Sequence, residues 1–259
     1  MTRNSVKACL VVAGLALAGS GAVTAPEPSA AQREAFSLAW QAGSRGDRAE
    51  FEKLMPGLQG YLLFPYLQYE DLRHRRGSAC DEEMAAFLAT HADWAFTGAL
   101  EAAWLRSLAG SRQWGSLITY GEDASDAEVR CAYAHARIRL GQTDDLLPLA
   151  QSLWNVGRSQ PDSCDAVFQW LQQQGGITAG LAWQRIQRSM EARQPRLARY
   201  LARFLPEDER IWVDRWYRQD QGGYQQLESA AQWPDQDKSR DIADYGLRRL
   251  ARSDPDQAW

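Results

Sequence analysis

The sequence lacks an excess of basic residues. Its 259 residues include 29 lysines and arginines against 33 aspartates and glutamates, a formal net charge of −4. Domains that bind nucleic acid are usually basic, because lysine and arginine neutralise phosphates and release counterions, so we expect no nucleic-acid partner. The hydrophobe-poor, highly charged composition of a disordered chain is absent too. With 45% hydrophobic and 24% charged residues, the chain has enough apolar side chains for a sizeable core.

Long apolar runs are also missing. The most apolar stretch, residues 8–18, is shorter than the roughly 20 residues that cross a bilayer. It follows Arg3 and Lys7 and precedes small residues, an order typical of a secretory signal peptide. We therefore expect residues 1–31 to be a signal peptide cleaved after Ala22 or Ala31, with a retained anchor as the alternative. The mature chain, 32–259, would then be periplasmic and without a membrane span.

Cysteines are few, and none forms a Cys-x-x-Cys pair, which leaves a dithiol redox site unsupported. Removal of the signal peptide leaves Cys80, Cys131 and Cys164, and an oxidising compartment favours pairing of two of them. Cys131 and Cys164 stand 33 positions apart, each at the start of an expected helix. A bridge between them would contribute about 3–4 kcal/mol in the chain-entropy model. Cys80 is expected as a free or partly buried thiol.

Alternating runs of β-branched residues are essentially absent, which disfavours a sheet. From about residue 32, apolar residues recur at spacings of three and four, as in Ala132, Ala136 and Leu140, the pattern of amphipathic helices. Polar residues that cap helix N-termini and glycines that end helices alternate every 12–20 residues or so. The expected starts lie at Asp47, Asp81, Ser125–Asp126, Thr143–Asp145, Asp162 and Asp237, and the expected ends at Gly43, Gly77, Gly110, Gly141, Gly157 and Gly175–Gly176.

These signals predict an all-α fold, an α-superhelix or solenoid of irregular helical hairpins, with a compact bundle as the alternative. Residues 132–136, Gly141 and Ala150 are arranged like a tetratricopeptide-type hairpin, although no strict 34-residue repeat runs along the chain. The last six residues, 254–259, place a proline where a further helix would begin. We therefore expect a domain that is truncated at its C-terminus.

Catalytic and cofactor motifs are absent as well. His74, His91 and His135 lack the spacing of metal ligands, and neither a Gly-x-Ser-x-Gly elbow nor a phosphate-binding glycine loop occurs. We expect no metal, no cofactor and no catalytic residue in this chain.

Tryptophan, in contrast, is abundant, with 11 residues. Trp104, Trp154, Trp170 and Trp183 lie in apolar-periodic settings and are expected in the core. Trp212 and Trp216 lie four apart on one helix face, next to Arg215. They either pack between helices or present a stacking surface for sugar rings with a guanidinium beside it.

Two motifs carry a resemblance. Residues 55–69, MPGLQGYLLFPYLQY, resemble the pattern M-P-G-L-x-x-Y-P-L-x-P-Y-L-x-Y of the soluble lytic murein transglycosylases. Residues 157–165, GRSQPDSCD, match the family's G-x-S-Q-P-x-x-C-D. Residues 131–133 and 141–142 agree in order and spacing. The clearest departure is Leu62, where the family has proline.

The resemblance implies a superhelical, U-shaped domain and a disulfide between Cys131 and Cys164. The family cleaves the β-1,4 bond between N-acetylmuramic acid and N-acetylglucosamine without water, leaving a 1,6-anhydro end. Its glutamate acts as acid and then base from a lysozyme-like C-terminal domain with the landmarks E-S-x-x-N-P, G-L-M-Q and A-Y-N-A-G. Glu228 and Ser229 echo the first landmark, but residues 232–233 depart from it and the others are missing.

We therefore expect a periplasmic, peptidoglycan-associated domain that is non-catalytic alone. Its partners would be glycan strands of peptidoglycan and cell-wall enzymes, and Trp212, Arg215 and Trp216 are the candidate glycan contacts. The alternatives are a fragment of an active transglycosylase and a periplasmic scaffold for protein–protein contacts.

Overall fold

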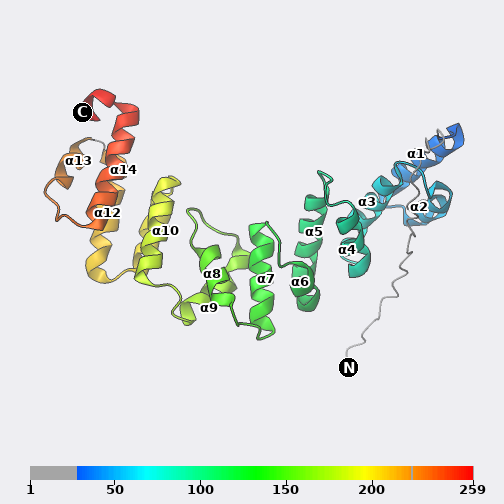
Figure 1. Ribbon diagram of the computed structural model, residues 1–259, viewed down its shortest axis with the longest axis horizontal. Helices are drawn as coiled ribbons and strands as arrows, with labels where there is room; N and C mark the ends of the chain where they lie inside the picture. The colour runs from blue at the N-terminus through cyan, green and yellow to red at the C-terminus, as the bar shows by residue number, and fades with distance from the viewer. Residues whose placement is uncertain (1–27, 223, 259) are drawn as a thin grey trace, which may run out of the picture. The chain divides into compact units, whose positions relative to one another are not determined.

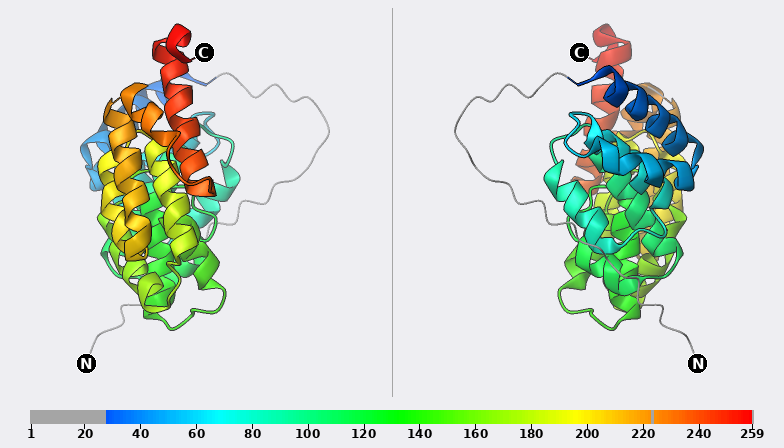
Figure 2. Two further views of the ribbon diagram at one scale, coloured as in Figure 1. Left: turned by 90° about the vertical axis from the view of Figure 1, so that its left-hand side faces the viewer. Right: turned by 90° about the vertical axis from the view of Figure 1, so that its right-hand side faces the viewer.

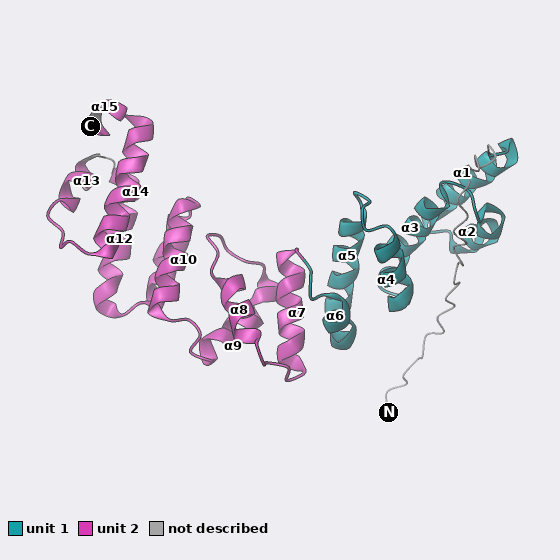
Figure 3. Ribbon diagram, viewed as in Figure 1, with its two compact units in different colours: residues 1–124 teal, residues 125–259 magenta. Residues whose placement is uncertain are grey.

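The computed structural model describes residues 28–222 and 224–258 and confirms the all-α fold class, since those residues form helices and turns without a strand. The chain divides into two compact units, one ending at Ala124 and the other beginning at Ser125 (Figure 3). The expected signal peptide lies outside the described residues, apart from its last four positions. No helix of the described ranges has both the length and the apolarity needed to cross a bilayer.

The first unit packs its initial helices around one small core. Phe51, Leu58 and Leu67 are buried there with Ala39 and Ala42, so the 55–69 motif supplies two of its members. The unit contains α1 (Ala30–Arg45), α2 (Arg48–Leu54), the 3₁₀ helix η1 (Met55–Leu58), α3 (Phe64–Arg75), α4 (Asp81–Thr90), α5 (Thr97–Gly110) and α6 (Trp114–Tyr120).

Local sequence accounts for the ends of α1. Ser29 and Gln32 form a capping box at its start, which satisfies two backbone donors. The expected end at Gly43 is wrong, because the helix continues to Arg45 and closes on Gly46, whose φ is 72°. Gly43 instead leaves room for Phe51, whose ring would lie 3.1 Å from an added Cβ.

The turn of the 55–69 motif also depends on glycine. Gly60 has a φ of 83°, a conformation that side chains disfavour. Leu62, where the resemblance leads one to expect proline, is 83% exposed. The replacement therefore leaves the core of the unit untouched.

The second unit is a succession of hairpins in which helices pack largely on their neighbours in sequence, as α7 does on α8, α10 on α11 and α11 on α12 (Figure 1 and Figure 2). The tetratricopeptide-like hairpin expected at residues 132–150 is the α7–α8 pair. Its elements are α7 (Ala127–Arg139), α8 (Leu146–Trp154), η2 (Asp162–Cys164), α9 (Asp165–Gln173), α10 (Ala179–Glu191), α11 (Pro195–Leu201), η3 (Ala202–Phe204), η4 (Glu207–Glu209), α12 (Arg210–Gly222), α13 (Tyr224–Ala230), α14 (Asp237–Ser253) and α15 (Pro255–Ala258).

The tryptophans expected in the core are found there, with one qualification. Trp104, Trp154 and Trp183 are buried, with exposed fractions of 2, 2 and 8%. Trp170 is partly buried and packs against the main cluster of the second unit. Large aromatic side chains thus fill the seams between successive helices, where they bury much apolar area.

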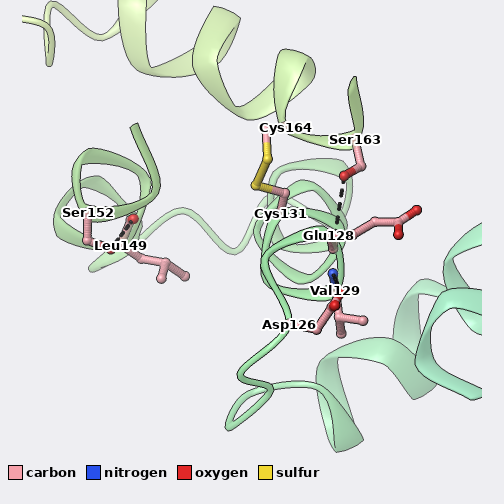
Figure 4. Close-up of a disulfide and its surroundings, with 8 residues drawn as sticks. All are labelled: Asp126, Glu128, Val129, Cys131, Leu149, Ser152, Ser163 and Cys164. Atoms are coloured by element: carbon pink, nitrogen blue, oxygen red, sulfur yellow. Dashed lines mark hydrogen bonds between the residues drawn. A yellow bond between two sulfur atoms is a disulfide. The ribbon is translucent and has the colours of Figure 1, made fainter. Parts of the chain in front are cut away.

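A disulfide joins Cys131 on α7 to Cys164 at the end of η2 (Figure 4), with the two Cα atoms 4.8 Å apart. Both residues are fully buried. Near the bridge, the Asp126 side chain accepts a hydrogen bond from the Val129 amide and caps α7. The expectation of a free thiol at Cys80 is not met, since no cysteine in the described part of the chain is free.

We predict that replacing both Cys131 and Cys164 by alanine lowers the free energy of unfolding by about 3–4 kcal/mol. The bridge joins residues 33 positions apart and thereby reduces the conformational entropy of the unfolded chain. Chemical denaturation of the oxidised wild type and the double variant measures the difference. In dithiothreitol the wild type should lose its advantage in stability over the double variant. Equal stability of the two oxidised proteins would contradict the prediction.

Candidate functional site

Trp212 and Trp216, the candidate glycan contacts on α12, do not present open faces. Their exposed fractions are 7 and 3%. The Trp216 ring packs on Trp183 at 5.5 Å and edge-on against Tyr245 at 5.7 Å. A sugar ring needs an accessible aromatic face for stacking, and that face of Trp216 is covered by α10 and α14.

Arg215 covers the neighbouring tryptophan. Its guanidinium carbon lies 4.5 Å from the centre of the Trp212 ring and 5.2 Å from that of Trp233, and the two indoles meet edge to face at 5.9 Å. The guanidinium is thus engaged in cation–π contacts. Of the two interpretations of the Trp212–Trp216 pair, the burial of both rings favours packing between helices.

Polar contacts reinforce this seam between α10, α12 and α14. Asp241 accepts hydrogen bonds from the Trp183 Nε1 at 3.2 Å and from the Gln187 Nε2 at 2.7 Å. The Tyr245 hydroxyl donates to Asp220 at 2.6 Å. Burial, followed by this hydrogen bond, raises the pKa of Tyr245, so the hydroxyl remains a donor at neutral pH. These groups hold helices together.

The 157–165 motif belongs to a loop that α10 clamps. The Arg185 Nε donates to the Val156 carbonyl at 3.3 Å, and Arg188 donates to the Asn155 carbonyl. Gly157 is required here, because an added Cβ would lie 2.4 Å from the Arg188 carbonyl oxygen. With Cys164 tied to α7, the loop is held from both sides, so this motif has a structural role.

Sequence patterns did not single out Arg185, yet it is the most deeply placed cation of this region, with 5% of its surface exposed. Its guanidinium carbon lies 4.6 Å from the Trp154 ring centre and 5.7 Å from that of Phe168. Burial lowers the pKa of Arg185 to about 10, which still leaves it charged at neutral pH. Aromatic faces and backbone carbonyls stabilise this charge.

Glu228 does not occupy a sheltered groove. It lies on α13 with an exposed side chain. A carboxyl that serves as acid and base near neutral pH needs burial to raise its pKa. In residues 28–222 and 224–258, no group of three or more histidine, cysteine or acidic side chains is arranged to hold a metal ion.

An exposed aromatic and cationic surface, which the tryptophan-based reasoning missed, follows α11 and η3. Tyr200 is 54% exposed, and the Arg203 guanidinium carbon lies 4.0 Å from its ring centre. Arg199, on the same helix, lies 4.7 Å from the ring of Tyr217 on α12. We call Arg199, Tyr200, Arg203 and Tyr217 the α11 surface. The signal was present in the sequence as tyrosine and arginine at helical spacing.

The first unit contains a hollow of about 380 Å³ between α4, α5 and α6. Its walls include Trp104 and Tyr120, whose ring centres are 5.1 Å apart, and Glu101 is the charged residue of its lining. Small residues of α4 and α5 leave this space open. No sequence pattern pointed to it, because its lining residues are dispersed along the chain and several of them are alanine or glycine.

We predict that replacing Trp212 and Trp216 by alanine destabilises the second unit by about 3–5 kcal/mol for each residue, because each truncation leaves a large cavity in the core. Thermal unfolding followed by circular dichroism tests this, with Tyr200→Ala as the matched exposed-aromatic control. A double variant as stable as the control would show that these indoles are dispensable for packing.

Comparison with known proteins found no matching family model. Among curated proteins, the chain is 26% identical over 200 residues to the soluble lytic murein transglycosylase of Escherichia coli (strain K12), covering 77% of this chain and 31% of that protein. It is 28% identical over 182 residues to the protein of the same name from Salmonella typhimurium, covering 68 and 28% of the two chains.

Solved structures agree with these matches. An inactive mutant of the lytic transglycosylase Slt from Pseudomonas aeruginosa matches with a TM-score of 0.73 at 32% identity, over 87% of this chain and 37% of that one. The 70 kDa soluble lytic transglycosylase of Escherichia coli matches with a TM-score of 0.72 at 25% identity, over 88 and 37%.

The resemblance drawn from the two motifs is thereby confirmed. The chain spans about a third of the length of the relatives that it matches. In sequence and in fold, this chain is a relative of the soluble lytic murein transglycosylases.

Proposed function

We propose that this chain is a periplasmic, peptidoglycan-associated superhelical domain of lytic-transglycosylase type, which holds glycan strands and does not cleave them by itself. The similarity to soluble lytic murein transglycosylases over 77% of the chain carries this proposal. The reaction that the resemblance implies, non-hydrolytic cleavage giving a 1,6-anhydro end, would be performed by a lysozyme-like domain whose landmarks do not occur in this sequence.

The surroundings of Glu228 support the non-catalytic part of the proposal. The transglycosylase reaction uses a single carboxyl first as acid and then as base, so the group must be sheltered from water. Glu228, the one residue with a partial match to the catalytic landmark, is exposed. The chain would therefore position or frame its polymer.

The α11 surface is the part of the second unit that suits an anionic glycan. Peptidoglycan carries free carboxylates on its stem peptides and on those lactyl groups that bear no peptide, and arginine pairs with carboxylates through a planar fork. Tyr200 adds an exposed aromatic face, and its stacking with Arg203 at 4.0 Å preorganises both side chains. An anionic sugar polymer could therefore pair with the arginine and stack on the tyrosine at the same site.

The N-terminal cap of α1 distinguishes between the two candidate signal-peptide cleavage sites. Cleavage after Ala22 would retain the Ser29–Gln32 capping box, whereas cleavage after Ala31 would remove Ser29 and lose it. A lost N-cap costs about 1 kcal/mol, so we favour the earlier site. The Cys131–Cys164 bridge suits an oxidising compartment.

We predict that the purified chain sediments with peptidoglycan sacculi and that Tyr200→Ala combined with Arg203→Ala weakens this retention about two- to fivefold, the effect of losing an exposed cation–π pair. Leu247→Ala, at an exposed apolar site on α14, is the matched control and should bind like the wild type. Retention that is equal for all three proteins would remove the α11 surface from the proposal. No retention at all would favour the alternative, a scaffold that contacts only proteins such as cell-wall enzymes.

We further predict that sacculi incubated with the purified chain release no 1,6-anhydro-muropeptides. Chromatography with mass spectrometry of the soluble fraction provides the measurement, and an authentic transglycosylase serves as the positive control. Anhydro products from this chain would contradict the non-catalytic proposal and favour an active enzyme fragment. Glu228→Gln would then show whether that carboxyl is responsible.

A further inference from the structure

The hollow of the first unit owes its space to small residues. Ala85 and Ala89 on α4 and Gly98 at the start of α5 line it, where larger side chains would fill the gap between the helices. The resulting volume, about 380 Å³, falls within the range of small-molecule sites. It could accept a compact group with a short chain.

The walls of the hollow are apolar and offer few hydrogen bonds. Trp104 is only 2% exposed and therefore cannot act as a stacking platform for a sugar ring. The Thr97 hydroxyl already donates to the Trp94 carbonyl at 2.7 Å. A sugar, which needs several hydrogen bonds to replace those with water, is poorly matched to this lining.

The charge of the hollow is negative. Glu101 is exposed, and its carboxylate makes no hydrogen bond or ion pair with the described residues. Burial, and then the charges of Glu82 and Asp81, raise the pKa of Tyr120. The lining includes no basic residue, so an anionic ligand would be repelled.

We propose that this hollow binds a primary ammonium group carried on a short aliphatic chain. The methylene groups would lie against Ala85 and Ala89, the ammonium would pair with Glu101, and the Tyr120 ring would add a cation–π contact. If the proposed association with peptidoglycan holds, on which this assignment of the source rests, the ammonium belongs to a diamino-acid side chain of a stem peptide.

The test is a titration of the whole chain with n-pentylamine, followed by NMR chemical shifts or calorimetry. We expect saturable binding in the millimolar range, because one exposed ion pair and a short chain supply little free energy. The neutral isostere n-pentanol should bind several-fold more weakly and pentanoate not measurably. Equal binding of n-pentylamine and n-pentanol would overturn the proposal.

Two variants locate the binding. Glu101→Gln keeps the shape and should weaken n-pentylamine binding about three- to fivefold, whereas Glu34→Gln, at an exposed glutamate on α1, should leave it unchanged. Ala89→Leu, at an exposed helical site that tolerates leucine, should fill the hollow and abolish binding while the melting temperature is retained. Equal binding by Glu101→Gln and Glu34→Gln, or undiminished binding by Ala89→Leu, would overturn the site.

A displacement experiment tests whether the ammonium group belongs to a stem peptide. A tripeptide ending in diaminopimelate should displace n-pentylamine, and the same peptide with its side-chain amine acetylated should not. Failure of the free peptide would overturn the stem-peptide assignment. Because these titrations use no sacculi, their outcome is independent of the sedimentation assay.

Discussion

The second unit depends on a loop that is held from both sides. The Cys131–Cys164 bond ties the end of residues 155–164 to α7, while Arg185 and Arg188 on α10 bind carbonyls at the beginning of the same loop. Gly157 has no side chain and so allows the loop to approach the backbone of α10 at Arg188. Helices α7 and α10 are thereby joined through one irregular segment. Because helices in hairpin arrays otherwise contact mainly their neighbours in sequence, such a covalent and cationic clamp provides the longer-range order.

The same constraint explains why the tryptophans are structural. Successive hairpins leave wide seams, and large flat side chains fill them with considerable buried area. Trp183 and Trp216 meet from α10 and α12, and Tyr245 closes the contact from α14. Trp212 and Trp216, the pair that first suggested sugar binding, are therefore used in packing. The exposed side chains of the second unit include Tyr200 stacked with Arg203, a combination suited to weak contacts with an anionic polymer.

The sequence was sufficient for the fold but not for the site. Asp47 and Asp126 cap helices as expected, and the hairpin at 132–150 has its expected form. The spacing of Trp212 and Trp216 showed that they share a helix face, but whether that face is covered depends on α14 and Trp233. Gly43 looked like a helix end, because sequence cannot distinguish a glycine that ends a helix from one that admits Phe51.

The hollow between α4, α5 and α6 illustrates the remaining limit. Alanine and glycine carry no chemical signal of their own, and their effect arises only where Trp104 and Tyr120 close the other side of the space. A catalytic carboxyl requires burial, whereas a carboxyl that pairs with the cation of a ligand, as proposed for Glu101, can lie at the edge of a hollow in contact with water. Glu228 and Glu101 both lie on exposed helix surfaces, which suits the second role and supports the proposal that the chain holds its partner without cleaving it.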